Sequence, residues 1–265
     1  MSYAAIKLEL RDNVAIVTLN RPEALNAIDG AMTSELMDVV TGITDGNIKA
    51  RALLITGAGR GFSSGADLLT TVNPDNPEAA KDVGGVLERE YNPLIKALRD
   101  LPVPIVSAVN GACAGAGMSL AMAADVILAA RSAFFLQAFV NVSLVPDAGS
   151  SYFLPRLVGK AKAARMMMLG EKIGAEEAER WGLLSAVCDD DKLMDEAFKI
   201  AAKLAAGPTG ALALIRRMIA ESEGNSLAEQ LDLEREFQRR AGRLEDFAEG
   251  VRAFLAKRKP EFKGR

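Results

Sequence analysis

Three continuous apolar runs, separated from one another by helical patterns, constrain the fold of this 265-residue chain more than any other feature. They are ALLITG at 52–57, PIVSAV at 104–109 and DVILAA at 125–130. A strand with one face in water alternates apolar and polar residues, whereas these runs are apolar at nearly every position. We therefore expect an α/β fold with a sheet that is covered on both faces.

The other segments of the first half extend this pattern. The short β-like runs AIKLEL at 5–10 and VAIVTL at 14–19 are separated by Arg-Asp-Asn, which predicts a β-hairpin. Apolar residues at helical spacing predict a helix over 30–43. A polar loop through Pro77 leads to an expected helix over 79–100, and a short helix precedes the run at 125–130.

The second half is mainly helical after about Pro146. Residues 161–187 indicate two short helices and a return strand, and the helical pattern continues from Lys192 almost to the end. We expect residues 1–200 to form the core and residues 201–265 to form a helical C-terminal region.

One C-terminal helix carries clear signals at both ends. Ser226 and Glu229 form a capping box at its start, and Gly242 ends it. The helix also has an apolar stripe that packs either on its own domain or on another subunit: Leu227, Leu231 and Phe237.

The chain contains no histidine, which excludes Ser-His-Asp and Cys-His nucleophile systems and imidazole-based zinc sites. Its two cysteines are too few for a disulfide framework and lack partners at metal-ligand spacing. We therefore expect no metal site and a reducing, cytoplasmic environment. A net charge of −3 with both signs mixed gives no indication of a nucleic-acid partner.

A stretch of 24 residues, 101–124, contains no charge and is long enough to raise the question of a membrane span. Prolines and glycines interrupt it, and PIVSAVNG is typical of a buried strand that enters a turn. The N-terminus lacks the basic region and long apolar run of a signal peptide. We expect no membrane segment.

Two glycine-rich segments each follow an expected strand: GAGRGFSSGADL at 57–68 and NGACAGAGMSLAMAAD at 110–125. Small residues let the backbone approach a ligand, and the second segment places N–H groups at a helix N-terminus, where negative charge is favoured. Two converging N–H groups would form an oxyanion hole for a carbonyl oxygen that gains charge. The alternatives are ordinary tight turns and a dinucleotide-binding fingerprint, although the glycine spacing does not fit the latter.

Four segments together resemble the crotonase superfamily, the enoyl-CoA hydratase/isomerase family: LNRPEALNAI, GRGFSSGADL, PIVSAVNGACAGAGMSLAMAADVILAA and LVPDAGSSYFLPRLVG. The resemblance is collinear from about residue 4 to the C-terminal end. It implies a crotonase-like spiral of ββα units with a C-terminal helical region that assembles a homotrimer or a hexamer, a dimer of trimers. It also implies an acyl-CoA thioester substrate, with coenzyme A as part of that substrate and no separate cofactor.

The resemblance further implies roles for individual residues. The backbone N–H groups of Ala66 and Ala116 would stabilise a thioester enolate. The contacts to coenzyme A or substrate would come from Ala24, Leu25, Ala27, Ser64, Asp67, Leu68, Gly115 and Phe139, with Phe262 supplied by a neighbouring subunit. The basic tail AKRKPEFKGR would either contact coenzyme A phosphates or remain solvated.

Hydratases similar to this chain use two glutamates, and the corresponding positions here hold Ser119 and Phe139. Addition of water to a double bond needs a base and an acid, so the standard hydratase mechanism lacks both groups. The remaining candidate is Asp147, which either caps the following helix or acts as the catalytic base. The active-site carboxylate of several isomerases and dehalogenases of the family falls at this position.

The environment expected for Asp147 favours its role as a base. Burial among Phe139, Val145 and Ala148 would raise its pKa toward neutrality. The segments AGAGMSLA and AFVNVSLVPDAGSSYFLPRL, with the C-terminal segment, most resemble the 1,2-epoxyphenylacetyl-CoA isomerases of phenylacetate degradation. We therefore expect an acyl-CoA isomerase that moves a double bond or rearranges a ring epoxide. The alternatives are an enoyl-CoA hydratase of fatty-acid or aromatic degradation and a non-catalytic acyl-CoA-binding subunit.

Other residues near these motifs have simpler interpretations. We expect Asp67 to order its loop, Tyr152 to be a half-buried structural residue and Cys113 to be a small hydrophobic residue. The methionines at 166–168 belong either to the core or to the substrate pocket.

Overall fold

The computed structural model describes residues 3–68 and 82–265. Its first element is an antiparallel hairpin of β1 (Ile6–Arg11) and β2 (Val14–Leu19). Asp12 and Asn13 form the two-residue turn with φ of 50° and 61°. Asn and Asp tolerate this left-handed conformation better than other non-glycine residues do. The predicted hairpin is confirmed.

The strands of the described residues form two sheets. The large sheet has the order β1-β2-β3-β5-β7-β10, and the small sheet has the order β4-β6-β8-β9. The further strands are β3 (Ala52–Gly57), β4 (Gly61–Ser63), β5 (Ile105–Val109), β6 (Ala112–Ala114), β7 (Val126–Ala130), β8 (Phe134–Leu136), β9 (Lys172–Gly174) and β10 (Ala186–Cys188). From β2 to β10 neighbouring strands of the large sheet are parallel.

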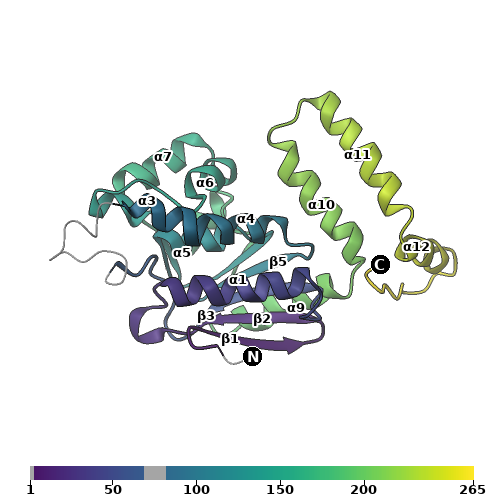
Figure 1. Cartoon of the computed structure of the whole chain (residues 1–265), viewed down its shortest axis with the longest axis horizontal. Coiled ribbons are helices and arrows are strands. Elements are labelled where there is room, and N and C mark those ends of the chain that lie inside the picture. The colour runs from purple at the N-terminus through teal and green to yellow at the C-terminus, as the bar shows by residue number, and fades with distance from the viewer. Residues whose placement is uncertain (1–2, 69–81) are drawn as a thin grey trace.

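Successive strand pairs supply both sheets, which gives the chain its spiral path. β3, β5 and β7 enter the large sheet, and β4, β6 and β8, which follow them, enter the small one. A helical segment then returns the chain to the next pair (Figure 1). This architecture confirms the predicted α/β fold of repeated ββα units.

Helices cover the sheets. The described helical segments before the C-terminal region are η1 (Pro22–Ala24), α1 (Gly30–Thr44), α3 (Val83–Val86), η3 (Leu87–Tyr91), α4 (Asn92–Asp100), α5 (Gly115–Met122), η4 (Ala138–Val142), α6 (Ser150–Val158), α7 (Lys160–Leu169), α8 (Ala175–Arg180) and α9 (Leu193–Ala205). Every residue of β5 is buried, as expected for a strand covered on both faces. α9 packs along β2, β3, β5 and β7, with its alanines at 197, 201 and 205 fully buried.

The helix expected over 79–100 is continuous from Val83 to Asp100 but changes its winding. α3 leads into the π-helical segment η3, and α4 follows directly. A π-helical turn inside a helix often marks a functional site. Residues 79–81 and the loop through Pro77 lie outside the described residues.

α10 (Thr209–Ser222) and α11 (Leu227–Ala241) form an antiparallel pair that extends away from the sheets, and α12 (Glu245–Leu255) follows (Figure 1). The capping box of Ser226 and Glu229 and the end of α11 at Gly242 are confirmed. α9 runs across the expected boundary at residue 200, so the extension itself begins at α10.

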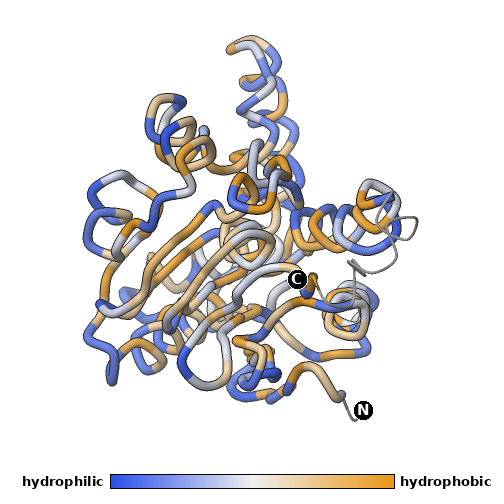
Figure 2. Tube along the Cα trace, turned by 90° about the vertical axis from the view of Figure 1, so that its left-hand side faces the viewer, coloured by the Kyte–Doolittle hydropathy of each residue, from blue (hydrophilic) through white to orange (hydrophobic). Residues whose placement is uncertain are grey.

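The apolar stripe on α11 is only partly covered within one chain. Phe237 is buried, whereas Leu227 and Leu231 are 76% and 54% exposed. Figure 2 shows that the protruding helices carry both hydrophobic and hydrophilic residues. The role of this region in trimer formation stays a prediction.

Within residues 3–68 and 82–265, no single helix is long and apolar enough to span a membrane. One pair of helices, α9 and α10, meets the length and composition criteria together but bends by 107°. The uncharged stretch at 101–124 instead contains β5, β6 and α5.

Candidate active site

A mainly apolar pocket of about 110 Å³ lies between the two glycine-rich turns, the η3 region and the segment before α6. Its described lining residues are Ser64, Gly65, Ala66, Leu68, Val83, Val86, Leu87, Tyr91, Gly115, Ala116, Ala138, Phe139, Val142, Leu144 and Asp147. The pocket therefore brings together seven of the residues predicted from the sequence: Ser64, Ala66, Leu68, Gly115, Ala116, Phe139 and Asp147. Asp147 is the one acid among these described lining residues.

The first glycine-rich turn leaves one backbone donor without an acceptor. Ile28 N–H donates to Gly65 C=O at 2.8 Å, and Asp67 N–H donates to Ile28 C=O at 2.9 Å. This short parallel bridge holds Ala66, which lies between Gly65 and Asp67, but does not use the Ala66 N–H. The Ala66 N–H is thus free among the described residues to bind a ligand in the pocket.

The second turn supplies a comparable donor. Ala116 is the second residue of α5, so its N–H has no partner within the helix. Gly65 has a φ of +103°, and a Cβ there would lie 3.5 Å from Ala116 N. The two turns are therefore in direct contact, and the tightest contact of a Cβ at Gly65 would be with Ala114 C=O at 3.1 Å.

A second glycine also permits the close approach. A Cβ on Gly117 would lie 2.5 Å from Ser63 Cβ and 2.9 Å from the Ser63 backbone oxygen. Such contacts are too short, so only glycine lets α5 pack this closely on β4. The AGAG sequence thus has a packing role, and its binding role stays a prediction.

Asp147 does not cap α6. The helix begins at Ser150 with Gly149 as its N-cap, and no side-chain capping bond is present. Asp147 Oδ1 is buried and has no hydrogen-bond partner among the described residues. The capping interpretation of the sequence is wrong, because two left-handed residues, Ala148 and Gly149, separate the carboxylate from the helix.

Burial raises the pKa of Asp147 from its ordinary value of 3.8 to about 6. The expected direction is confirmed, but one expected neighbour is wrong. Val145 is 78% exposed and is not among the described lining residues of the pocket. Phe139 lines the pocket and Ala148 is buried, as expected, and Leu144 is a lining residue that was not expected.

The two positions that correspond to hydratase glutamates hold groups without acid–base function. Phe139 is buried in the pocket wall. Ser119 is fully buried, and its Oγ donates to the backbone C=O of Asp147 at 3.0 Å.

Tyr91 is the pocket residue of clearest interest that the sequence did not indicate. It ends η3, is buried, and its hydroxyl donates to Ile28 C=O at 2.9 Å. Burial and the nearby Asp147 charge raise its pKa, so the hydroxyl stays protonated. Ile28 also accepts from Asp67, so Tyr91 ties the helix wall to the bridge that holds Ala66. A π-helical turn has no recognisable sequence pattern, which explains why Tyr91 was missed.

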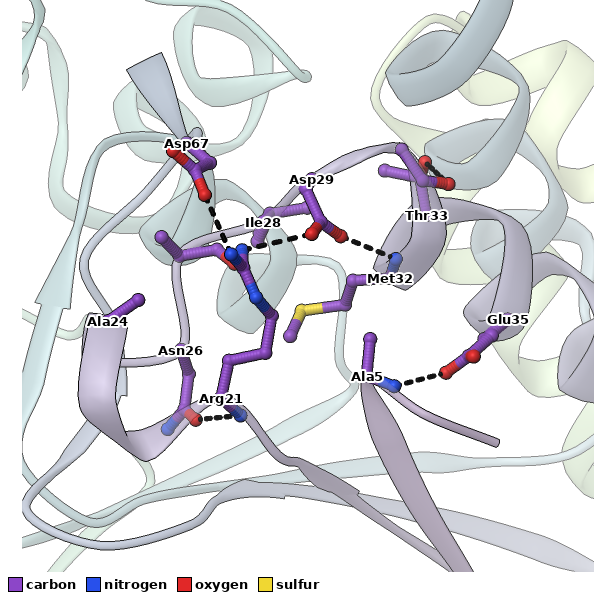
Figure 3. A network of polar contacts seen from close by, with 12 residues as sticks. Ala5, Arg21, Ala24, Asn26, Ile28, Asp29, Met32, Thr33, Glu35 and Asp67 are labelled. Atoms are coloured by element: carbon purple, nitrogen blue, oxygen red, sulfur yellow. Dashed lines mark hydrogen bonds and ion pairs between the residues drawn. The ribbon is translucent and has the colours of Figure 1, made fainter. Parts of the chain in front are cut away.

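Beside the pocket, Arg21 connects the segment before α1 to the first turn (Figure 3). Its guanidinium donates to Asp67 Oδ2 at 2.9 Å and to Ala27 C=O at 2.7 Å, and it lies 3.1 Å from Asp29. Asp67 therefore orders its loop, as expected from the sequence. Its contact with substrate stays a prediction.

Asn26 completes this support. It is fully buried, accepts from Arg21 N–H at 2.9 Å, and donates to the C=O groups of Ala58 and Gly61 at 2.9 and 2.8 Å. The expected coenzyme A contacts Ala24, Leu25 and Ala27 lie in the same segment. Leu25 C=O accepts from Ser64 N–H at 2.9 Å, so this segment borders the first turn.

Phe262 does not line this pocket. It lies beside Gly250 of α12, 3.6 Å from the position of a Cβ there, and its predicted contact from a neighbouring subunit is not visible in one chain. Much of the basic tail folds back on α12, because Glu249 pairs with Arg258 at 2.6 Å and Asp246 accepts the N–H groups of Lys263 and Gly264.

The remaining candidates are structural. Cys113 is fully buried, and burial raises the pKa of its thiol. The Tyr152 hydroxyl bonds Glu223 at 2.6 Å, away from the pocket. Met166 is in the core, whereas Met168 is exposed. In the described part of the chain, no group of three or more Cys, Asp or Glu side chains is arranged to hold a metal ion.

Comparison with known proteins agrees with this geometry. The family model for enoyl-CoA hydratase/isomerase matches residues 9–265. The 1,2-epoxyphenylacetyl-CoA isomerase of Escherichia coli (strain K12) is 47% identical over 95% of each chain. A Rhodobacter capsulatus protein named "Probable enoyl-CoA hydratase" is 44% identical over the whole of both. The crystal structure of an enoyl-CoA hydratase from Polaromonas sp. JS666 superimposes with a TM-score of 0.89 at 32% identity, covering 98% of this chain and 100% of that one.

Proposed function

Because this chain belongs to the enoyl-CoA hydratase/isomerase family, the crotonase family, we propose that it is an acyl-CoA isomerase in which Asp147 carries the proton. The observation that carries the proposal is a carboxylate with a raised pKa, the one acid among the described lining residues of an apolar pocket. Two N–H groups of the same pocket, those of Ala66 and Ala116, have no partner among the described residues. An isomerisation needs no net addition of water, so one carboxylate is sufficient for it.

The N–H groups of Ala66 and Ala116 bind the thioester oxygen of the substrate. Removal of a proton from the carbon next to the carbonyl places negative charge on this oxygen, and the two donors stabilise that charge. Loss of one such donor typically raises the barrier by about 3 kcal/mol. These groups belong to the main chain and are already fixed by the bridge to Ile28 and by the start of α5.

Asp147 removes the proton with its carboxylate and becomes a carboxylic acid. The electron pair of the broken C–H bond moves into the enolate. The carboxylic acid then returns the same proton to a different carbon, which shifts the double bond and regenerates the carboxylate. Apolar surroundings favour the neutral form of the acid, so the carboxylate is a stronger base than an aspartate in water.

The name of the 47% identical relative favours ring-1,2-epoxyphenylacetyl-CoA as the substrate. In that case the carbon–carbon bond shared by the epoxide and the six-membered ring breaks while both carbon–oxygen bonds remain, which expands the ring to a seven-membered oxepin. The pocket wall supports a compact ring, since it is built from Phe139, Leu87, Val86 and Leu144. Its volume of about 110 Å³ is similar to the ~150 Å³ of an apolar cavity that binds benzene in another protein.

The assembly is also part of the proposal. Apolar side chains on the C-terminal extension are exposed in one chain, including Phe254 at 82% and Leu255 at 75%. We propose that they are covered in a homotrimer or a dimer of trimers, in which Phe262 reaches the coenzyme A of a neighbouring subunit. Light scattering after gel filtration measures this directly, and a monomer at micromolar concentration would contradict it.

The activity is tested with a panel of unsaturated and aryl-acetyl thioesters in heavy water, followed by mass spectrometry. The isomerase proposal predicts α-carbon exchange and isomerisation with negligible hydration of crotonyl-CoA. Rapid hydration would instead favour the hydratase alternative, which the name of the 44% identical relative suggests. Binding without exchange would indicate a non-catalytic subunit.

The role of Asp147 is tested by Asp147→Asn in the folded protein. Acid–base groups typically contribute 10²–10⁴-fold to a rate, so we expect a loss of about that size in kcat. The wild-type kcat/KM should increase with pH and reach half of its plateau near pH 6, because only the carboxylate is active. Wild-type turnover by Asp147→Asn would refute the role.

A further inference from the structure

Ser119 connects the helix of one N–H donor to the segment of the carboxylate. Its Oγ is fully buried and donates to Asp147 C=O at 3.0 Å, with Gly115 C=O farther away at 3.4 Å. A hydroxyl has one proton to donate, and the shorter bond goes to Asp147. Ser119 lies on α5, three residues after Ala116.

The backbone after Asp147 needs such a contact. Ala148 has a φ of 48° and Gly149 a φ of 85°, so two left-handed residues follow one another. This conformation is unfavourable for Ala148, because its Cβ crowds the backbone. Strained backbone persists only where the surrounding structure holds it.

A second buried connection leads from the same turn to α5. Ser150 N–H donates to Asp147 C=O at 2.9 Å, and Ser150 Oγ donates to Gln137 Oε1 at 2.9 Å. Gln137 Nε2 in turn contacts Met118 Sδ at 3.1 Å. Ser150, Gln137 and Ser119 are all fully buried, so these bonds are not exchanged with water.

The Asp147 side chain has no comparable support of its own, since its Oδ1 lacks a hydrogen-bond partner among the described residues. Its position over a substrate therefore depends on its backbone. We propose that Ser119 is a positioning residue, which fixes the Asp147 turn against α5 and so sets the spacing between the carboxylate and the Ala116 N–H. This inference rests on the proposed function.

The experiment compares Ser119→Ala with Ser119→Cys and with a matched control, Ser107→Ala. Ser107 is also a fully buried serine, but its hydroxyl has no hydrogen-bond partner among the described residues. All variants are assayed as full-length protein for kcat, KM and the pH dependence of kcat/KM, with thermal unfolding to verify folding.

We expect Ser119→Ala to lower kcat by at least about tenfold, since a misplacement of about 1 Å can cost 10²-fold in rate. KM should change less than about twofold, because the N–H donors remain in place. The pH midpoint should shift below that of the wild type, because a loosened turn admits water to the carboxylate. Ser119→Cys should lie between the two, because a thiol is a weak donor. Ser107→Ala should keep the wild-type kcat and pH midpoint.

Asp147→Asn in the same series separates the two proposals. If Asp147→Asn is inactive while Ser119→Ala keeps the wild-type kcat and pH midpoint, the positioning role is wrong and the proposed function stands. An equal loss in Ser119→Ala and Ser107→Ala would also overturn the positioning role, because it would reflect general packing. If Ser119→Ala does not fold, a Ser119→Cys variant with wild-type kcat and pH midpoint would overturn it in the same way. Turnover by Asp147→Asn would instead refute the proposed function.

Discussion

Replacement of Asp147 by Asn should stabilise the folded protein increasingly as the pH rises, while it removes the proposed base. Burial raises the pKa of Asp147 from 3.8 to about 6, so the folded protein holds this proton more tightly than the unfolded chain does. Stability contributed by the protonated acid is fully present below about pH 4 and is lost as the pH rises through about 6. Above that pH the folded protein carries the full cost of a buried carboxylate.

The magnitude follows from the size of the shift. A pKa change of about two units corresponds to roughly 3 kcal/mol at 1.36 kcal/mol per unit. The Asn side chain stays neutral at every pH, so the variant does not carry this pH-dependent cost of a buried charge. Any constant effect of the unpaired Asn amide is the same at each pH. The stability difference between variant and wild type should therefore increase by about 2 kcal/mol from pH 4 to pH 8.

Unfolding by urea at several pH values, at one protein concentration, measures this difference. The melting temperature difference should widen by about 5 °C over the same range, given the usual scaling for chains of this size. Asp191→Asn, at an exposed position, is the matched control. A stability difference that stays constant with pH would refute the claim that the Asp147 carboxylate is strained by burial.

Three further outcomes follow from contacts around the pocket. Gly117→Ala should destabilise the protein by about 1–3 kcal/mol and lower kcat, because the new Cβ would push α5 away from Ser63. Urea unfolding and steady-state kinetics measure the two effects, and wild-type values of both stability and kcat would contradict the close packing. Asn26→Ala should cost about 2–4 kcal/mol in urea unfolding, because it removes three hydrogen bonds of a fully buried side chain, and a cost below about 1 kcal/mol would contradict that account. Tyr91→Phe should keep the fold but lower kcat severalfold, because the bond to Ile28 C=O that supports Ala66 is lost; a kcat equal to that of the wild type would show that the bond has no role.

The sequence predicted the large sheet and the long helices because their apolar patterns extend over five residues or more. β2, β3, β5 and β7 were all expected, as were α1, α9 and α11. The small sheet was not. Its strands β4, β6, β8 and β9 are three residues long each, too short for any periodicity, and β4 and β6 lie inside segments that indicated turns.

The pocket residues likewise divide into those that could be predicted from the sequence and those that could not. The two glycine-rich turns were visible in the strand–turn order of the sequence, whereas the assignment of Ala66 and Ala116 within them came from the resemblance to the crotonase family. The failure of Asp147 to act as a cap depended on the left-handed conformation of Ala148, a residue that rarely adopts it. Contacts such as Ser119 with Asp147 join residues 28 positions apart, and no local pattern indicates them.

The two donors that are proposed to bind the carbonyl oxygen are peptide groups, and this has a consequence for how such a protein can change over evolutionary time. A point mutation replaces a side chain but leaves the peptide N–H where the turn holds it. The pair of N–H donors proposed for the acyl group is therefore retained when other residues of the sequence change, provided that the glycines persist. A new reaction then needs only a different side chain across the pocket from these two donors, so a fold of this kind can acquire new chemistry one substitution at a time.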